Sequence, residues 1–203
     1  MSHTFALLVP VKALSLAKSR LSVRGVAERE PLMRAFALDA IAAALDSPLV
    51  AQVHLVTDDP GFDLAGVHRL PDEGDGDLNR ALRHASLRVR LADPDVAVAA
   101  MCADLPSLRT DDLTDALSAG LTPRWFVADA EGTGTTLLAA APGVALEPHF
   151  GTGSARRHEE SGAAPVRAEL ASLRQDVDTS ADLTAARALG VGQHTARALD
   201  VQL

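Results

Sequence analysis

Short, nearly uninterrupted apolar runs alternate along this chain with segments of helical periodicity. Residues 5–11 and 96–103 form two such runs, which are typical of strands buried on both faces of a parallel sheet. Residues 28–45 and 78–91 instead predict helices. A doubly buried sheet needs helices on both sides, so the sequence predicts an α/β fold with a mostly parallel sheet between helical layers. In the first helix the expected inward stripe is Leu32, Met33, Phe36, Ala37, Ala40, Ile41, Ala44 and Leu45.

Turn and capping signals divide much of the remaining chain. Residues 52–57 predict another strand, and residues 124–130 and 135–141 predict two more, separated by the turn sequence EGTG. Thr110 is expected to cap a short helix. The residues expected to face inward on that helix are Leu113, Ala116 and Leu117.

The C-terminal part begins with a glycine loop, "HFGTGSARRHEE", that enters a helix. Thr179 and Asp182 have the spacing of a capping box for the next helix, and Gly190 is its expected stop. We expect the weakly patterned residues after about 190 to pack loosely. Because 203 residues contain no repeat or linker, the sequence predicts a single domain over residues 1–203.

The acidic composition limits the class of partner. The chain has 19 Lys and Arg against 27 Asp and Glu, which gives a net charge of −8. That balance argues against a general nucleic-acid binder but allows a small anionic ligand in a local basic pocket. The longest apolar runs are too short to span a membrane. A single cysteine, Cys102, fits a reducing compartment, and the first strand follows Met1 too closely for a signal peptide, so we expect a cytoplasmic protein.

Charged residues follow the expected strands. Ligands of open α/β sheets bind outside the carboxyl ends of the strands, so these residues are the first candidates for a site. Gly-rich loops and the start of the last helix are expected at the same edge. In chain order the charged candidates are Lys12, Lys18, Arg20, Asp58, Asp59, Asp104, Asp176 and Asp178.

The loop after the first strand contains both lysines of the chain, whereas the other 17 basic residues are arginine. A compact ammonium group binds phosphate as a point charge, which a planar guanidinium does not duplicate. This placement favours a phosphate-binding loop at Lys12, Lys18 and Arg20, and a solvated loop is the alternative.

The carboxylates suit Mg²⁺, which prefers oxygen ligands and bridges to phosphate. Asp104 is either such a ligand or a helix-cap or turn residue before Pro106, and Asp178 is either a ligand or a cap near Thr179. Together with the lysines they favour phosphoryl or nucleotidyl transfer, which depends on charge neutralisation and positioning rather than on a covalent nucleophile.

Several other motifs are absent or weak. No G-x-x-x-x-G-K-[ST] motif and no G-x-G-x-x-G after the first strand occur, which disfavours a P-loop enzyme and a dinucleotide-binding dehydrogenase. His149, His158 and Cys102 lack metal-binding spacing, so we interpret them as structural or supporting residues. Asn79 remains a site candidate beside an acidic segment that we expect to be a solvated loop. That segment contains Asp72, Glu73, Asp75 and Asp77.

Six motifs, in this order, resemble those of the guanylyltransferases that make the deazaflavin coenzyme F-420, which act on 2-phospho-L-lactate or phosphoenolpyruvate. The resemblance implies a Rossmann-like three-layer α/β/α sandwich similar to the nucleotide-diphospho-sugar transferases. It also implies transfer of GMP from GTP to a three-carbon phospho-acid, with Mg²⁺ and with release of pyrophosphate. The motifs are "VPVKALSLAKSRLS", "GDGDLNRAL", "ADLPSL", "GTGTTLL", "FGTGSARRH" and "DVDTSADL".

The resemblance implies roles for particular residues. Asp104 matches a magnesium ligand, and Asp176 and Asp178 lie in a second metal-binding segment, in which we favour Asp176 as the direct ligand. The residues that match the acceptor phosphate site are Thr136, Gly151 and Ser154. Those that match the nucleotide site are Lys12, Lys18 and Arg20, over the GTP phosphates, and Asn79, near the nucleoside.

The glycine loop offers a second source of anion binding. We expect uncapped N–H groups of residues 151–154, at a helix start, to form an anion seat. Two alternatives remain open at this point: a related nucleotidyltransferase with another acceptor, such as a sugar phosphate or molybdopterin, and a nucleotide-binding regulatory module without turnover. Phosphoenolpyruvate, 2-phospho-L-lactate and 3-phosphoglycerate all carry one phosphate and one carboxylate, and the bacterial-type composition favours phosphoenolpyruvate.

Overall fold

The computed structural model describes residues 4–11, 26–62, 64–120 and 123–200. Seven strands of these residues form one sheet, in the order β3-β2-β1-β4-β6-β5-β7. All neighbouring pairs are parallel except those made by β6, which runs antiparallel to β4 and to β5. The predicted mostly parallel sheet is therefore confirmed. The strands are β1 (Phe5–Pro10), β2 (Val50–Val56), β3 (Val67–Leu70), β4 (Ala97–Met101), β5 (Arg124–Ala128), β6 (Thr135–Ala140) and β7 (Ala164–Pro165).

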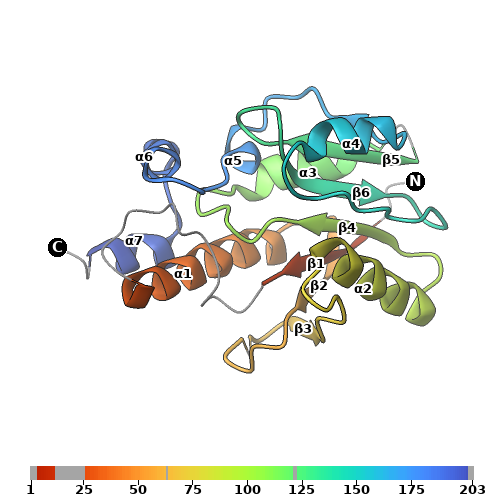
Figure 1. The fold of residues 1–203 in the computed structure, drawn as a ribbon, viewed down its shortest axis with the longest axis horizontal. Coiled ribbons are helices and arrows are strands. Elements are labelled where there is room, and N and C mark those ends of the chain that lie inside the picture. Colours follow the sequence, from red (N-terminus) through yellow and green to blue (C-terminus); the bar gives the residue numbers. More distant parts are fainter. Residues whose placement is uncertain (1–3, 12–25, 63, 121–122, 201–203) are drawn as a thin grey trace.

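Helices cover both faces of this sheet (Figure 1). Leu7 of β1 packs in one core with residues of the first, third and fifth helices, whereas Leu8 packs in a second core with residues of the second and fourth. Successive strand residues thus point into opposite cores, as the apolar runs require. The helices are α1 (Val26–Leu45), α2 (Leu78–Ala92), α3 (Thr110–Ser118), α4 (Ser154–Glu160), α5 (Ala171–Arg174), α6 (Ser180–Leu189) and α7 (Gln193–Asp200).

Two local predictions are wrong. Thr110 does not cap α3, because Arg109 occupies the cap position and the Thr110 hydroxyl donates to the Ala43 carbonyl. Leu45, the last residue of the expected inward stripe on α1, is 43% exposed. The helix turns this position away from the core at its final turn. The inward residues of α3 are buried as expected, and the Thr179–Asp182 capping box with Gly190 as C-cap is confirmed.

Four elements, β3, β7, α5 and α7, were not predicted from the sequence. β3 has the sequence VHRL and contains only two apolar residues, because it lies at the edge of the sheet with His68 and Arg69 exposed. β7 is two residues long, and α5 is four. Such short elements carry too few residues for a periodic signal.

The prediction that the residues after about 190 pack loosely is wrong. α7 lies alongside α1 (Figure 1), and Ala198 and Leu199 join a third apolar cluster with Leu32 and Phe36 of α1. The contact depends on Asp39 of α1, a buried carboxylate that caps the start of α7. Its two oxygens accept the N–H groups of His194 and Thr195, at 3.0 and 2.8 Å.

The structure describes no helix that is both long and apolar enough to cross a bilayer.

Replacing Asp39 with alanine should destabilise the fold. Asp39→Ala leaves two amide groups at the start of α7 without their acceptors, and losing such a cap costs about 1–3 kcal/mol. We expect the free energy of unfolding in urea to fall by that amount. Asp46→Ala is the matched control, because Asp46 follows the same helix but is exposed. An unfolding curve for Asp39→Ala that overlays the control would show that this carboxylate does not anchor α7.

Candidate functional site

The antiparallel strand β6 brings the hairpin loop between β5 and β6, residues 129–134, to the carboxyl edge of the parallel strands. Because β6 runs opposite to β4, its first residues lie where β4 ends. The N–H of Cys102, just after β4, donates to the carbonyl of Thr136 at 2.9 Å. Asp104 and Thr136, which are predicted to serve metal and acceptor, therefore follow or begin neighbouring strands at one edge.

A second main-chain contact brings Asp104 to the Asp176–Asp178 segment. The N–H of Val177 donates to the carbonyl of Asp104 at 3.1 Å. Val177 is fully buried and packs with Leu32 and Ala186, so its position is held by the third apolar cluster. Asp176 and Asp178 flank this anchored residue, and Asp176 is partly buried whereas Asp178 is exposed. The two carboxylate segments that the sequence analysis singled out are thus adjacent in space.

The start of α6 is capped by residues other than Asp178. The Thr179 hydroxyl accepts the N–H of Asp182, and the Asp182 carboxylate accepts the N–H groups of Thr179 and Asp178, at 2.7 and 3.1 Å. The cap role that we considered for Asp178 belongs instead to Thr179 and Asp182.

These carboxylates are of the residue type that holds Mg²⁺. Mg²⁺ is usually held by one or two protein carboxylates, with waters and substrate phosphates completing its coordination. Asp104 and the adjacent Asp176–Asp178 segment supply carboxylates of that number. Within the described ranges, no three His, Cys, Asp or Glu side chains cluster as a closed all-protein metal site.

The glycine loop adopts a tight turn before α4. Gly151 and Gly153 have φ angles of 110° and 71°, a region that favours glycine. Ser154 is buried and begins α4. The expected anion seat, the N–H groups of residues 151–154, loses one member because the N–H of Ser154 already has an acceptor, and the next N–H along the helix, that of Ala155, also has one. The N–H of Ser154 donates to the Gly151 carbonyl, and that of Ala155 to the Thr133 carbonyl.

Asn79 holds this loop rather than extending away from the protein. Its side-chain amide donates to the Phe150 carbonyl at 3.1 Å and accepts the Phe150 N–H at 2.6 Å. Both hydrogen-bonding groups of one main-chain residue are therefore fixed by one side chain from the first turn of α2. The sequence analysis selected Asn79 as a site residue but missed this partner, which is 71 positions away.

The hairpin loop between β5 and β6 is ordered by Asp129, which the sequence analysis missed. The two oxygens of its carboxylate accept the N–H groups of Thr133 and Gly134, at 2.9 and 2.7 Å. A Cβ atom on Gly134 would lie 2.2 Å from one of these oxygens, so a side chain at this position would displace the Asp129 carboxylate. Thr136, two residues on, is fully buried, with its hydroxyl 3.5 Å from the Val127 carbonyl.

The acidic segment before α2 is more structured than the solvated loop that we expected. Asp77 caps α2 by accepting the N–H groups of Asn79 and Arg80. Glu73 pairs with Arg88, which lowers the pKa of the Glu73 carboxyl through a side-chain hydrogen bond. These acids serve local pairs and caps.

The predictions for Lys12, Lys18 and Arg20 concern positions outside the described residues, and they remain predictions.

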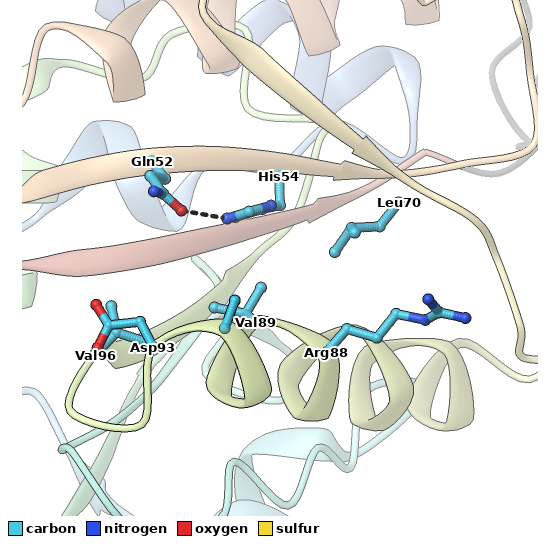
Figure 2. Close-up of a pocket in the computed structure, with 8 residues that line it drawn as sticks. Gln52, His54, Leu70, Arg88, Val89, Asp93 and Val96 are labelled. Carbon is cyan, nitrogen blue, oxygen red and sulfur yellow. Dashed lines mark hydrogen bonds between the residues drawn. The ribbon is translucent and has the colours of Figure 1, made fainter.

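A cavity of about 250 Å³ lies away from this edge, between β2 and the C-terminal half of α2 (Figure 2). Gln52 and His54 line it from β2, and the His54 ring bonds to the Gln52 side chain at 3.0 Å. Burial, and next the neighbouring His68, lower the pKa of His54 to about 4. Val96, which precedes β4, also lines it, and none of the predicted site residues that the structure describes does.

The sequence as a whole is similar to a family of nucleotidyl-transferring enzymes. A model of the family described as "Guanylyl transferase CofC like" matches residues 5–199. A phosphoenolpyruvate guanylyltransferase of Streptomyces avermitilis is 52% identical over 201 residues, covering 96% of this chain and 93% of the relative. One from Streptomyces scabiei is 51% identical over 206 residues, covering 96% and 95%.

Solved structures support the fold. A candidate nucleotide-diphospho-sugar transferase from Desulfovibrio desulfuricans G20 superposes with a TM-score of 0.65 at 20% identity, covering 89% of this chain and 85% of its own. A CMP:2-keto-3-deoxy-manno-octonic acid synthetase complexed with CTP gives 0.56 at 18% identity, covering 92% and 98%. With the sheet and its two helical layers, they confirm the α/β sandwich, Rossmann-like and similar to the nucleotide-diphospho-sugar transferases.

Removing the Asn79 side chain should loosen the glycine loop. Asn79→Ala removes the acceptor of the Phe150 N–H, whereas the Phe150 carbonyl keeps a longer contact with the Arg157 guanidinium at 3.4 Å. Losing the acceptor of a buried N–H costs about 1–3 kcal/mol locally. We expect faster hydrogen exchange at the Phe150 amide, measured by NMR, with the sheet amides unchanged. Arg83→Ala, an exposed position on the same helix, is the control. Unchanged protection of Phe150 would mean that other contacts hold the loop.

Proposed function

The chain belongs to the guanylyl transferase CofC-like family, and from this we propose that it transfers GMP from GTP to the phosphate of phosphoenolpyruvate and releases pyrophosphate. The observation that carries the proposal is about 50% identity, over nearly the whole chain, to relatives named for this activity. The main-chain bond between Val177 and Asp104 supports it, because it joins the two segments that would serve the reaction.

The reaction needs no covalent protein nucleophile. A phosphate oxygen of the acceptor attacks the α-phosphorus of GTP and forms the new P–O bond. The bond from the α-phosphorus to the oxygen bridging to the β-phosphate breaks, and pyrophosphate leaves with that electron pair. An ionised phosphate is already a nucleophile, so no strong general base is required. The protein must instead reduce the repulsion between a triphosphate and an anionic acid.

We assign this task to charges at the carboxyl edge. Asp104 and Asp176, with Asp178 beside them, would hold Mg²⁺, which supplies positive charge to phosphate oxygens when bound. Lys12, Lys18 and Arg20 would cover the GTP phosphates and the departing pyrophosphate. GTP binding, the metal and these roles are parts of the proposal.

The acceptor would bind at the start of β6 and the glycine loop. Thr136, Gly151 and Ser154 are the residues assigned to its phosphate. Supporting this, Thr136 lies beside the segment after β4, and the N–H of Ala155 bonds to the hairpin that leads into β6. Asn79, assigned near the nucleoside, would act by holding Phe150 beside this loop.

The same proposal places the enzyme in the synthesis of coenzyme F-420 in the cytoplasm, with GTP and a small phospho-acid as its partners rather than nucleic acid or membrane. A single cysteine and an acidic surface charge agree with this setting.

A pyrophosphate-release assay tests the proposal directly. The purified protein is given each of the four nucleoside triphosphates with phosphoenolpyruvate, 2-phospho-L-lactate or 3-phosphoglycerate. We expect turnover with GTP and phosphoenolpyruvate to exceed every other combination. Preference for another acceptor would correct the substrate, and GTP binding without pyrophosphate release under any combination would indicate a regulatory module.

Neutralising either lysine should slow turnover. Lys12→Ala and Lys18→Ala each remove a charge that meets the phosphates, and losing one preorganised contact of this kind lowers the rate by about 10²–10³. Lys12→Arg should also be impaired, because a planar fork replaces a point charge. Arg69→Ala, on the exposed edge strand, is the control. Rates within a few-fold of the parent for both alanine variants would indicate that the lysines belong to a solvated loop and do not contact the phosphates.

Acceptor binding should require metal through Asp104. Phosphoenolpyruvate at about 100 times its dissociation constant adds roughly 2.7 kcal/mol of stability, which raises Tm by several degrees. We expect this shift with Mg²⁺ and not with excess EDTA. Asp104→Asn should abolish the shift and turnover together. Its own Tm without ligand should stay near the parent's or rise slightly, because clustered site carboxylates repel each other when no metal is bound.

The control for Asp104 is Asp111→Asn, an exposed carboxylate in the first turn of α3. It should retain the Mg²⁺-dependent shift. If Asp104→Asn also retains the full shift, the metal site must be reassigned to Asp176 and Asp178. A grossly unfolded Asp104→Asn would show that this carboxylate is structural.

A further inference from the structure

His158 connects the two segments to which the acceptor site is assigned. It is fully buried on α4, four residues after Ser154, and so lies on the same side of that helix. Its Nδ1 is 2.9 Å from the Thr135 hydroxyl, next to Thr136 on β6. Its Nε2 accepts the N–H of His149 at 2.9 Å, two residues before Gly151. One imidazole therefore ties β6 to the glycine loop.

The protonation of His158 follows from its surroundings. Burial lowers the pKa of His158 to about 4, and the nearby groups of His149, Arg157 and Arg124 add to this effect. The ring is neutral near pH 7. Because Nε2 accepts the His149 N–H, it carries no proton, and the single ring proton lies on Nδ1 and points to Thr135. This tautomer makes both contacts at once, whereas a protonated ring would face the His149 N–H with a second donor.

The neighbours of His158 limit its freedom to turn. Its ring meets the Phe150 ring edge-on, with centroids 5.3 Å apart, and packs against Phe126 at 5.8 Å. Arg157, the preceding residue, donates to the carbonyls of His149 and Thr152. These polar contacts to the loop go to its main chain, so they set backbone positions.

We propose that His158, together with Thr135, is a positioning residue that fixes the separation between Thr136 and the Gly151–Ser154 turn and thereby sets acceptor affinity. This rests on the proposed function, because it takes the acceptor phosphate to bind between those segments. His158 acts through the loop and β6 and does not touch the reacting atoms. Loss of its contacts should weaken binding of the phospho-acid much more than binding of GTP, whose phosphates are assigned to Lys12, Lys18 and Arg20.

The test is steady-state kinetics with phosphoenolpyruvate and GTP varied separately. His158→Phe keeps a ring but removes both hydrogen bonds, which are worth about 1–2 kcal/mol together, or roughly a 5- to 30-fold rise in the KM for phosphoenolpyruvate. The KM for GTP should change by less than about two-fold. Thr135→Val, which removes only the hydroxyl, should raise the same KM by less.

Two further variants separate positioning from general damage. His158→Gln offers a carbonyl oxygen near the place of Nε2, so it should accept the His149 N–H and restore part of the affinity. Val89 lies in the same apolar core as Phe150 and Ala155 but lines the cavity between β2 and α2, so Val89→Ala destabilises that core without removing a hydrogen bond of His158. It should lower Tm and leave both KM values unchanged. If His158→Phe does not fold, Thr135→Val and His158→Gln decide the question.

The outcomes distinguish failure of the positioning role of His158 from failure of the proposed function. A rise confined to the KM for phosphoenolpyruvate in the His158→Phe and Thr135→Val proteins, partly reversed in His158→Gln, supports the positioning role. Equal changes in both KM values, or a fall in kcat alone, overturn it while the proposed function stands. A parent enzyme that releases no pyrophosphate with phosphoenolpyruvate overturns the proposed function and this inference with it.

Discussion

One main-chain hydrogen bond, from the N–H of Val177 to the carbonyl of Asp104, determines the geometry of this site. It joins two segments that are 73 positions apart in the chain and that carry the candidate metal carboxylates. The bond holds because Val177 is buried among Leu32, Phe36 and Ala186, so the position of Asp176 and Asp178 depends on the packing of α1 against α6. A main-chain contact sets this spacing whatever the charge of the carboxylates, so the two segments stay adjacent whether or not a cation is bound.

The acceptor side is organised by the same kind of contact. Asn79, Arg157 and His158 all direct polar groups at the main chain of residues 149–152, and Asp129 does so for the hairpin. Backbone held in this way needs little rearrangement when an anion arrives, so less binding energy is lost in ordering it. The glycine loop, with two residues in the left-handed region, would otherwise be among the more variable parts of the chain.

The sequence was informative where a signal is local. Doubly buried strands, the inward-facing stripe of α1 and the Thr179–Asp182 capping box each follow from residues within one element. All three are confirmed, except for Leu45 at the end of the stripe. Long-range partners could not be predicted in this way. Nothing near Asn79 indicates that its amide meets Phe150, and nothing near Asp39 indicates that it caps α7. α7 was missed because its burial depends on these distant contacts.

The acidic charge of the chain raises the question of how its carboxyl edge could accept two polyanions. Many of the acids near that edge are committed to local partners. Asp58, Asp77 and Asp129 accept main-chain N–H groups, Asp182 caps α6, and Glu73 pairs with Arg88. Such contacts offset much of the negative potential that a triphosphate would meet. An anion site in a protein of net charge −8 therefore requires only local positive charge, which two lysines, one arginine and a divalent cation would supply.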